Sequence, residues 1–209
     1  MAIKPTFDLE NASGHAITFG VDEVGRGPLA GPVVAAAVYI PVDKRGHPVW
    51  SSVRDSKALS AARRDVLFNV IQEQSVFGIG SASVEEIDQI NILQATFLAM
   101  RRAIEACGVS PEHILIDGNR LPKNWDWSCS SVIKGDAHSI SIAAASILAK
   151  VTRDRLMEEI GADYPSYGWG DNAGYGTPAH ISALETMGVT PHHRRSFEPV
   201  KSLILTKSA

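Results

Sequence analysis

The feature that most constrains the fold is a pair of adjacent acids, Asp22 and Glu23, set between two apolar runs. Residues 16–24 and 32–40 are rich in apolar and β-branched side chains, which predicts two buried strands. Burying an unpaired charge is costly, so the acids need a positive partner, and a divalent cation is the obvious candidate. The glycines on either side of Arg26 allow a sharp turn or a close approach to a ligand. Taken alone, the stretch also suits a tight hairpin with a surface acid pair.

Size and composition indicate one α/β domain with a small C-terminal appendage. The chain has 209 residues, of which 44% are hydrophobic, enough for a single core. Its net charge of −3 does not mark a nucleic-acid-binding protein, so any basic surface must be local. Cys107 and Cys129 lack the spacing of a zinc site and are typical of reduced thiols. Because we find no signal-peptide pattern and no apolar run that could span a bilayer, we expect a cytoplasmic protein without membrane contact.

The order of the predicted elements indicates three regions. Residues 1–15 are polar and are expected to form a flexible N-terminal arm. Strands and helices interleave over residues 16–164, with two consecutive strands at the start, which predicts an α/β fold with a mixed sheet flanked by helices. Residues 165–209 combine an aromatic, glycine-rich connection with further helical segments and are expected to form a C-terminal helical extension.

Four acids lie where apolar strands give way to a loop or a helix: Asp22, Glu23, Asp117 and Asp136. Strand ends of this kind can converge at one edge of a sheet. Oxygen-only clusters suit hard cations such as Mg²⁺ or Mn²⁺, and two such ions about 4 Å apart can support phosphodiester hydrolysis. Each acid taken singly is more often a cap or a turn residue, so the prediction depends on all four occupying similar junctions.

Other motifs point to less specific chemistry. No dinucleotide-binding glycine pattern, phosphate-binding loop or serine-hydrolase elbow occurs in the sequence. Ser146, Lys150 and Arg153 form one polar stripe of a predicted helix, which would ordinarily be a solvated face. His192 and His193 precede two arginines and suit either a phosphate-facing patch or a solvated surface.

Several motifs together resemble the ribonuclease HII family, and they occur in the same order from about residue 17 onward. The matching stretches are residues 22–32, 55–57, 115–119, 134–136, 144–154, 174–177 and 192–197. The resemblance implies a ribonuclease H-like fold with an added helical C-terminal part. It also implies a metal-dependent endonuclease that cuts the RNA strand of RNA/DNA hybrids and cuts 5′ of single ribonucleotides in duplex DNA, leaving 5′-phosphate and 3′-hydroxyl ends.

The resemblance also implies roles for individual residues. The four strand-end acids would be the catalytic carboxylates that bind Mn²⁺ or Mg²⁺. Gly25, Arg26 and Gly27 would sense the 2′-hydroxyl at the RNA–DNA junction, and Tyr175 would stack on the junction sugar. Phosphate contacts would come from Lys57, Ser146, Lys150, Arg153 and Arg194. Ala173 stands where many relatives carry lysine, so we expect weaker contact with the nucleic-acid backbone there.

Two rival functions stay open at this stage. A DNA-only nuclease or resolvase of the same fold could use the same carboxylates, but it would have no use for the glycine–arginine loop and Tyr175. A non-catalytic nucleic-acid-binding module would not need four acids, which repel phosphate in the absence of metal. The expected partner is RNA/DNA hybrid or DNA containing ribonucleotides. We expect a monomer, and no sliding-clamp-binding peptide is evident in the sequence.

Overall fold

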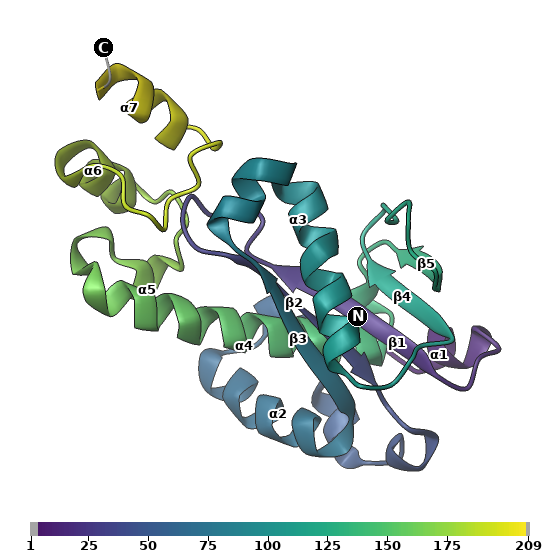
Figure 1. Cartoon of the computed structure of the whole chain (residues 1–209). Coiled ribbons are helices and arrows are strands. Elements are labelled where there is room, and N and C mark those ends of the chain that lie inside the picture. The colour runs from purple at the N-terminus through teal and green to yellow at the C-terminus, as the bar shows by residue number, and fades with distance from the viewer. Residues whose placement is uncertain (1–3, 208–209) are drawn as a thin grey trace.

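The protein is built on a five-stranded mixed sheet with helices on both faces (Figure 1). The computed structural model describes residues 4–207. In chain order the helices and strands are α1 (Asp8–Ala12), β1 (Thr18–Val24), β2 (Val33–Tyr39), α2 (Ala61–Gln74), β3 (Val76–Ala82), α3 (Val84–Ala106), β4 (His113–Asp117), β5 (Ser128–Val132), α4 (Ile140–Asp163), α5 (Trp169–Asn172), α6 (Pro178–Met187) and α7 (Val200–Lys207). Within residues 4–207, every helix is too short or too polar to span a lipid bilayer.

The strand order is β3-β2-β1-β4-β5, which places β1 at the centre of the sheet. β1 pairs antiparallel with β2 and parallel with β4, so the predicted mixed sheet is confirmed. In the parallel pair, Val21 lies opposite Ile116. The next residue along each strand is an acid, Asp22 or Asp117, so the register alone brings two predicted site residues to neighbouring strand ends.

Each face of the sheet has its own apolar core. α3 covers one face, where its buried side chains pack against those of β1 and β4. α4 covers the other face together with α2 (Figure 1). Ser139 caps the start of α4 by accepting a hydrogen bond from the amide of Ile142. A Cβ at Gly20 of β1 would collide with the α4 main chain, so glycine is what allows this helix to lie directly on the central strand.

The described part of the predicted N-terminal arm, residues 4–15, is not a loose segment. It contains α1, and Glu10 of that helix is buried. Glu10 Oε1 accepts hydrogen bonds from the hydroxyls of Ser139 and Ser141 at 2.7 Å each and from the amide of Ser141 at 2.9 Å. The expectation of a flexible arm is therefore wrong for these residues, because a buried carboxylate attaches them to the start of α4.

The C-terminal helices form a third apolar cluster around the fully buried Trp169. Leu29 and Ala30, which belong to the connection between β1 and β2, are part of this cluster, and so is Met157 of α4. Residues 165–207 therefore pack against the connection that follows the Asp22–Glu23 pair. That packing positions the C-terminal segment beside the predicted site.

Candidate active site

One cavity of about 310 Å³ brings together most of the predicted site residues. Its lining combines acids from the strand ends with residues of α4 and of the C-terminal extension. The lining residues are Asp22, Glu23, Val24, Ser56, Lys57, Asp117, Asp136, Ser146, Lys150 and Tyr175. All four predicted carboxylates therefore share one cavity, although they are separated by up to 114 positions in the sequence.

Main-chain amides hold two of the four carboxylates. The Glu23 amide donates to Asp22 Oδ1 at 2.7 Å, and the Gly135 amide donates to Asp117 Oδ1 at 2.6 Å. The second bond links the end of β4 to the short 3₁₀ turn Gly135–Ala137, which carries Asp136. The main chain thus positions the acids before any ligand binds.

Burial and mutual repulsion make the four carboxylates hard to ionise together. The pKa of Asp22 is raised well above its usual value, first by burial and then by the charges of Glu23, Asp117 and Asp136. Burial also raises the pKa values of the other three acids, against the opposing effect of Arg26 on Glu23 and of Lys57 on Asp117 and Asp136. An external cation would offset the cost of ionising these acids together, so the arrangement favours cation binding.

The carboxylates are not yet gathered as they would be around one ion. Within residues 4–207, no group of three or more acidic, histidine or cysteine side chains is arranged to hold a metal ion. The donor set nevertheless fits Mg²⁺ or Mn²⁺, because it consists of carboxylate oxygens. Binding would require the side chains to approach one another within the cavity.

Two buried arginines support the connection between β1 and β2, which we call the glycine loop (residues 25–32). Arg153 and Arg194 are both fully buried. Their guanidinium groups donate to main-chain carbonyls at 2.5–3.1 Å. The accepting carbonyls are those of Gly25, Arg26, Ala30, Gly31, Pro32 and Ala173. These bonds fix the shape of the glycine loop and tie it to α4 and to the C-terminal extension.

The expectation that Arg153 and Arg194 contact phosphate is wrong for this structure, because both side chains are buried and already bonded to carbonyls. Burial lowers the pKa of Arg153 to about 10, and burial together with the charge of Arg153 lowers the pKa of Arg194 to about 9. Both groups stay charged at neutral pH. Their role is to position the glycine loop, and the positive potential they add lies beneath it.

The glycine loop and Tyr175 lie next to each other. Gly25 has a φ of 91°, and a Cβ there would collide with the guanidinium of Arg153. A Cβ at Gly27 would lie 3.5 Å from the Tyr175 ring. The ring itself is 45% exposed and lines the cavity, while the exposed Arg26 reaches back to Glu23 at 3.4 Å. The three loop residues and the tyrosine therefore form one wall beside the carboxylates.

A chain of histidines holds the main chain of Tyr175. The amide of Thr190 donates to His193 Nδ1 at 3.0 Å, so the proton of the neutral His193 ring is on Nε2. That N–H donates to His180 Nε2 at 3.1 Å, which also accepts from Trp169 Nε1 at 3.1 Å. His180 must therefore carry its proton on Nδ1, and this donates to the Tyr175 carbonyl at 2.9 Å. Each ring nitrogen of His180 and His193 is thus defined as either a hydrogen-bond donor or an acceptor.

The other predicted contacts differ in accessibility. Lys57 is exposed at the mouth of the cavity. Ser146 is buried, and its hydroxyl lies 2.7 Å from that of Ser56. Lys150 is mostly covered and pairs with Asp154 at 2.6 Å. Lys57 is therefore the most accessible of the predicted phosphate contacts.

Sequence reasoning missed His180 and assigned His193 to a surface patch. Both rings are fully buried, so the surface interpretation of His193 is wrong. His193 lies directly before Arg194, and the Arg194 amide donates to the Leu29 carbonyl at 2.8 Å. That pairing with the glycine loop draws the segment inward, which a local run of basic residues does not reveal. His180 follows Tyr175 by only five residues, and this spacing was the signal that could have linked the two.

Comparison with known proteins agrees with this geometry. The family model described as ribonuclease HII matches residues 19–200. The chain is 57% identical over 207 residues to ribonuclease HII of Magnetococcus marinus, covering 96% of this chain and 95% of that one. It is 52% identical over 204 residues to ribonuclease HII of Ruegeria pomeroyi, covering 96% and 86%. The crystal structure of ribonuclease H2 from Pyrococcus horikoshii OT3 superposes with a TM-score of 0.71 at 25% identity, covering 90% and 97%. The chain therefore belongs to the ribonuclease HII family of ribonuclease H endonucleases.

Proposed function

We propose that this endonuclease needs a divalent metal and cuts on the 5′ side of single ribonucleotides in duplex DNA as well as within the RNA strand of hybrids. It would leave 5′-phosphate and 3′-hydroxyl ends and serve ribonucleotide removal during replication or repair. The observation that carries the proposal is the shared cavity, where the buried Asp22 and three half-buried acids lie beside an exposed tyrosine and a glycine loop. A nuclease that does not distinguish ribose from deoxyribose would need only the acids.

In this proposal Asp22, Glu23, Asp117 and Asp136 hold Mg²⁺ or Mn²⁺. Bound there, the ions would supply an activated water and neutralise charge on the leaving oxygen. The main-chain bonds to Asp22 and Asp117 fix the direction of those carboxylates beforehand. Lys57, which already offsets the charge of Asp117 and Asp136, would approach the phosphate from the open side of the cavity.

Recognition of the ribonucleotide is assigned to the wall formed by Tyr175 and the glycine loop. The 2′-hydroxyl is the group that distinguishes RNA from DNA at a given position. An exposed aromatic ring gives the sugar a flat contact surface, and the absence of a side chain at the exposed Gly27 leaves the main chain accessible beside that ring. The buried arginines keep this wall in place without contacting the substrate.

The test is cleavage of a labelled DNA duplex that contains one ribonucleotide, with an all-DNA duplex and a continuous RNA/DNA hybrid beside it. Each substrate is incubated with Mg²⁺, with Mn²⁺ and with a chelator. Wild type and Asp22→Asn are compared at equal concentration, after circular dichroism has shown that both are folded. We expect a nick 5′ of the ribonucleotide that needs metal and is lost in the variant.

Other outcomes would identify a different function. Equal cutting of the all-DNA duplex would contradict ribonucleotide recognition and favour the resolvase interpretation. Cutting of the hybrid alone would limit the activity to continuous RNA strands. Tight binding without any cutting would leave a nucleic-acid-binding module. Full activity of Asp22→Asn would contradict the assignment of the carboxylates.

A further inference from the structure

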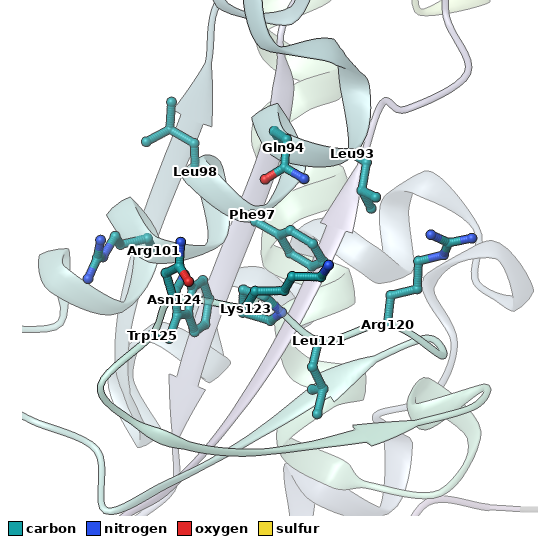
Figure 2. Close-up of a pocket in the computed structure, with 11 residues that line it drawn as sticks. Leu93, Gln94, Phe97, Leu98, Arg101, Arg120, Leu121, Lys123, Asn124 and Trp125 are labelled. Atoms are coloured by element: carbon teal, nitrogen blue, oxygen red, sulfur yellow. The ribbon is translucent and has the colours of Figure 1, made fainter.

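A second groove lies away from the carboxylate cavity, between α3 and the connection from β4 to β5 (Figure 2). We call it the α3 groove. Its volume is about 470 Å³, within the range of about 300–1,000 Å³ typical of ligand-binding pockets. The lining residues are Leu93, Gln94, Phe97, Leu98, Arg101, Arg120, Leu121, Pro122, Lys123, Asn124 and Trp125. None of them lines the carboxylate cavity, so the groove is a separate site.

Six of the eleven residues that line the α3 groove are apolar. Figure 2 shows the side chains of α3 on one side and those of the connecting segment on the other. Leu121 is 41% exposed, although it is a large apolar side chain on a short loop. Trp125 is only half-buried and touches Trp127 edge-on, with ring centroids 5.5 Å apart. Apolar side chains held open in this way form a pocket for an apolar group from elsewhere.

Every charged residue that lines the groove is positive: Arg101, Arg120 and Lys123. The sign of the charge in the groove is thus opposite to that of the whole chain, which carries a net charge of −3. The guanidinium of Arg101 is already engaged, because it pairs with Glu105 Oε1 at 3.5 Å and lies over the Trp127 ring at 5.6 Å from its centroid. The groove therefore combines apolar side chains with the cationic side chains of Arg120 and Lys123.

We propose that the α3 groove is a docking site for an acidic peptide segment of a partner protein. Apolar side chains of the segment would fill the space between Phe97 and Leu121, and its carboxylates would face Arg120 and Lys123. Charge complementarity selects this partner, because apolar anchors with acidic flanks match both features of the groove. A nucleic-acid strand suits it less, because the indole of Trp125 is half-buried and touches Trp127 edge-on, which limits its stacking on bases.

The test uses a random peptide library displayed on phage, selected on the full-length protein. We expect enrichment of peptides that combine Asp or Glu with Leu, Phe or Trp. A synthetic enriched peptide, labelled with fluorescein, should bind wild type and lose affinity by about tenfold or more with Arg120→Glu/Lys123→Glu. The matched control is Lys44→Glu/Lys201→Glu, which makes the same charge change at exposed positions outside the groove and should bind like wild type.

A second variant separates the apolar contribution from the charge. Leu121→Asp places a carboxylate on the exposed loop side chain and should weaken binding without changing hybrid cleavage or the melting temperature. The proposal is overturned if no acidic–apolar peptides are enriched, or if the enriched peptide binds both groove variants as it binds wild type. Displacement of the peptide by single-stranded DNA, with Leu121→Asp having no effect, would instead show a nucleic-acid surface. The peptide-binding measurements do not depend on the nuclease activity.

Discussion

Acidification should destabilise the protein through His193. This ring is buried among His180, Trp169 and Thr190, and its pKa is lowered from 6.5 to about 4 by burial and by the neighbouring histidines. Because the folded-state pKa lies below the unfolded value, the unfolded chain takes up the proton first as pH falls. The contribution of the neutral ring is complete above about pH 6.5 and is lost progressively toward pH 4.

The size of the effect follows from these two pKa values. Between pH 7.5 and 5.0, linkage with values of 6.5 and about 4 removes about 2 kcal/mol of unfolding free energy. His193→Gln has no ring to protonate, so its loss over the same interval should be about 2 kcal/mol smaller than that of wild type. The variant is expected to be less stable at pH 7.5, because Gln cannot reproduce both ring contacts, but the prediction concerns only the difference between the two pH values.

Urea unfolding followed by circular dichroism at both pH values measures this difference. The control is His138→Gln, since His138 is exposed and takes no part in the hydrogen bonds of the buried histidines. Its pH-dependent loss should stay close to that of wild type. If His193→Gln and wild type lose the same free energy within about 0.5 kcal/mol, the ring does not stay neutral in the folded protein, and the hydrogen-bond assignment from Thr190 to Tyr175 is refuted.

The remaining predictions concern single positions. Gly25→Ala should destabilise the protein by about 2 kcal/mol or more in urea unfolding, because its positive φ and the guanidinium of Arg153 both oppose a Cβ; wild-type stability would contradict this. Glu10→Ala should cost about 2 kcal/mol by leaving donors at the start of α4 unpaired, and a change below about 0.5 kcal/mol would disprove the docking of α1. Arg194→Lys should lower the melting temperature yet leave the salt dependence of hybrid binding unchanged. A weaker salt dependence in this variant would show that Arg194 contacts phosphate after all. Ala173→Lys should make hybrid binding more strongly dependent on salt.

The sheet and the carboxylate cavity were predictable because they depend on short-range pattern. Apolar runs that end in an acid mark strand ends, and parallel neighbours place those ends side by side. Asp22 and Asp117 are therefore adjacent because each directly follows an apolar run, and these two runs pair as the parallel strands β1 and β4. The mixed sheet followed from two consecutive strands before the first helix.

The buried polar contacts were not predictable, because they depend on partners distant in sequence. Arg194 is buried by carbonyls of the glycine loop more than 160 residues away, and nothing in its own neighbourhood distinguishes it from a surface arginine. Glu10 lies in a helix of five residues, too short to show an apolar period, and its bonds reach across about 130 residues to the start of α4. Local sequence shows which residues are polar, while the fold decides which of them are buried.

Ala173 offers a test in which local strain is held constant. Its φ of 49° is left-handed, it is half-buried, and its carbonyl accepts a bond from Arg153. Alanine and lysine both carry a Cβ, so exchanging them leaves this backbone strain nearly unchanged and isolates the added charge two residues before Tyr175. One new phosphate contact should steepen the plot of log affinity against log salt by about 0.9 and tighten hybrid binding at physiological salt. Ala173→Gln has similar reach without the charge and should keep the wild-type slope. If Ala173→Lys also keeps that slope, position 173 lies outside the path of the nucleic-acid backbone.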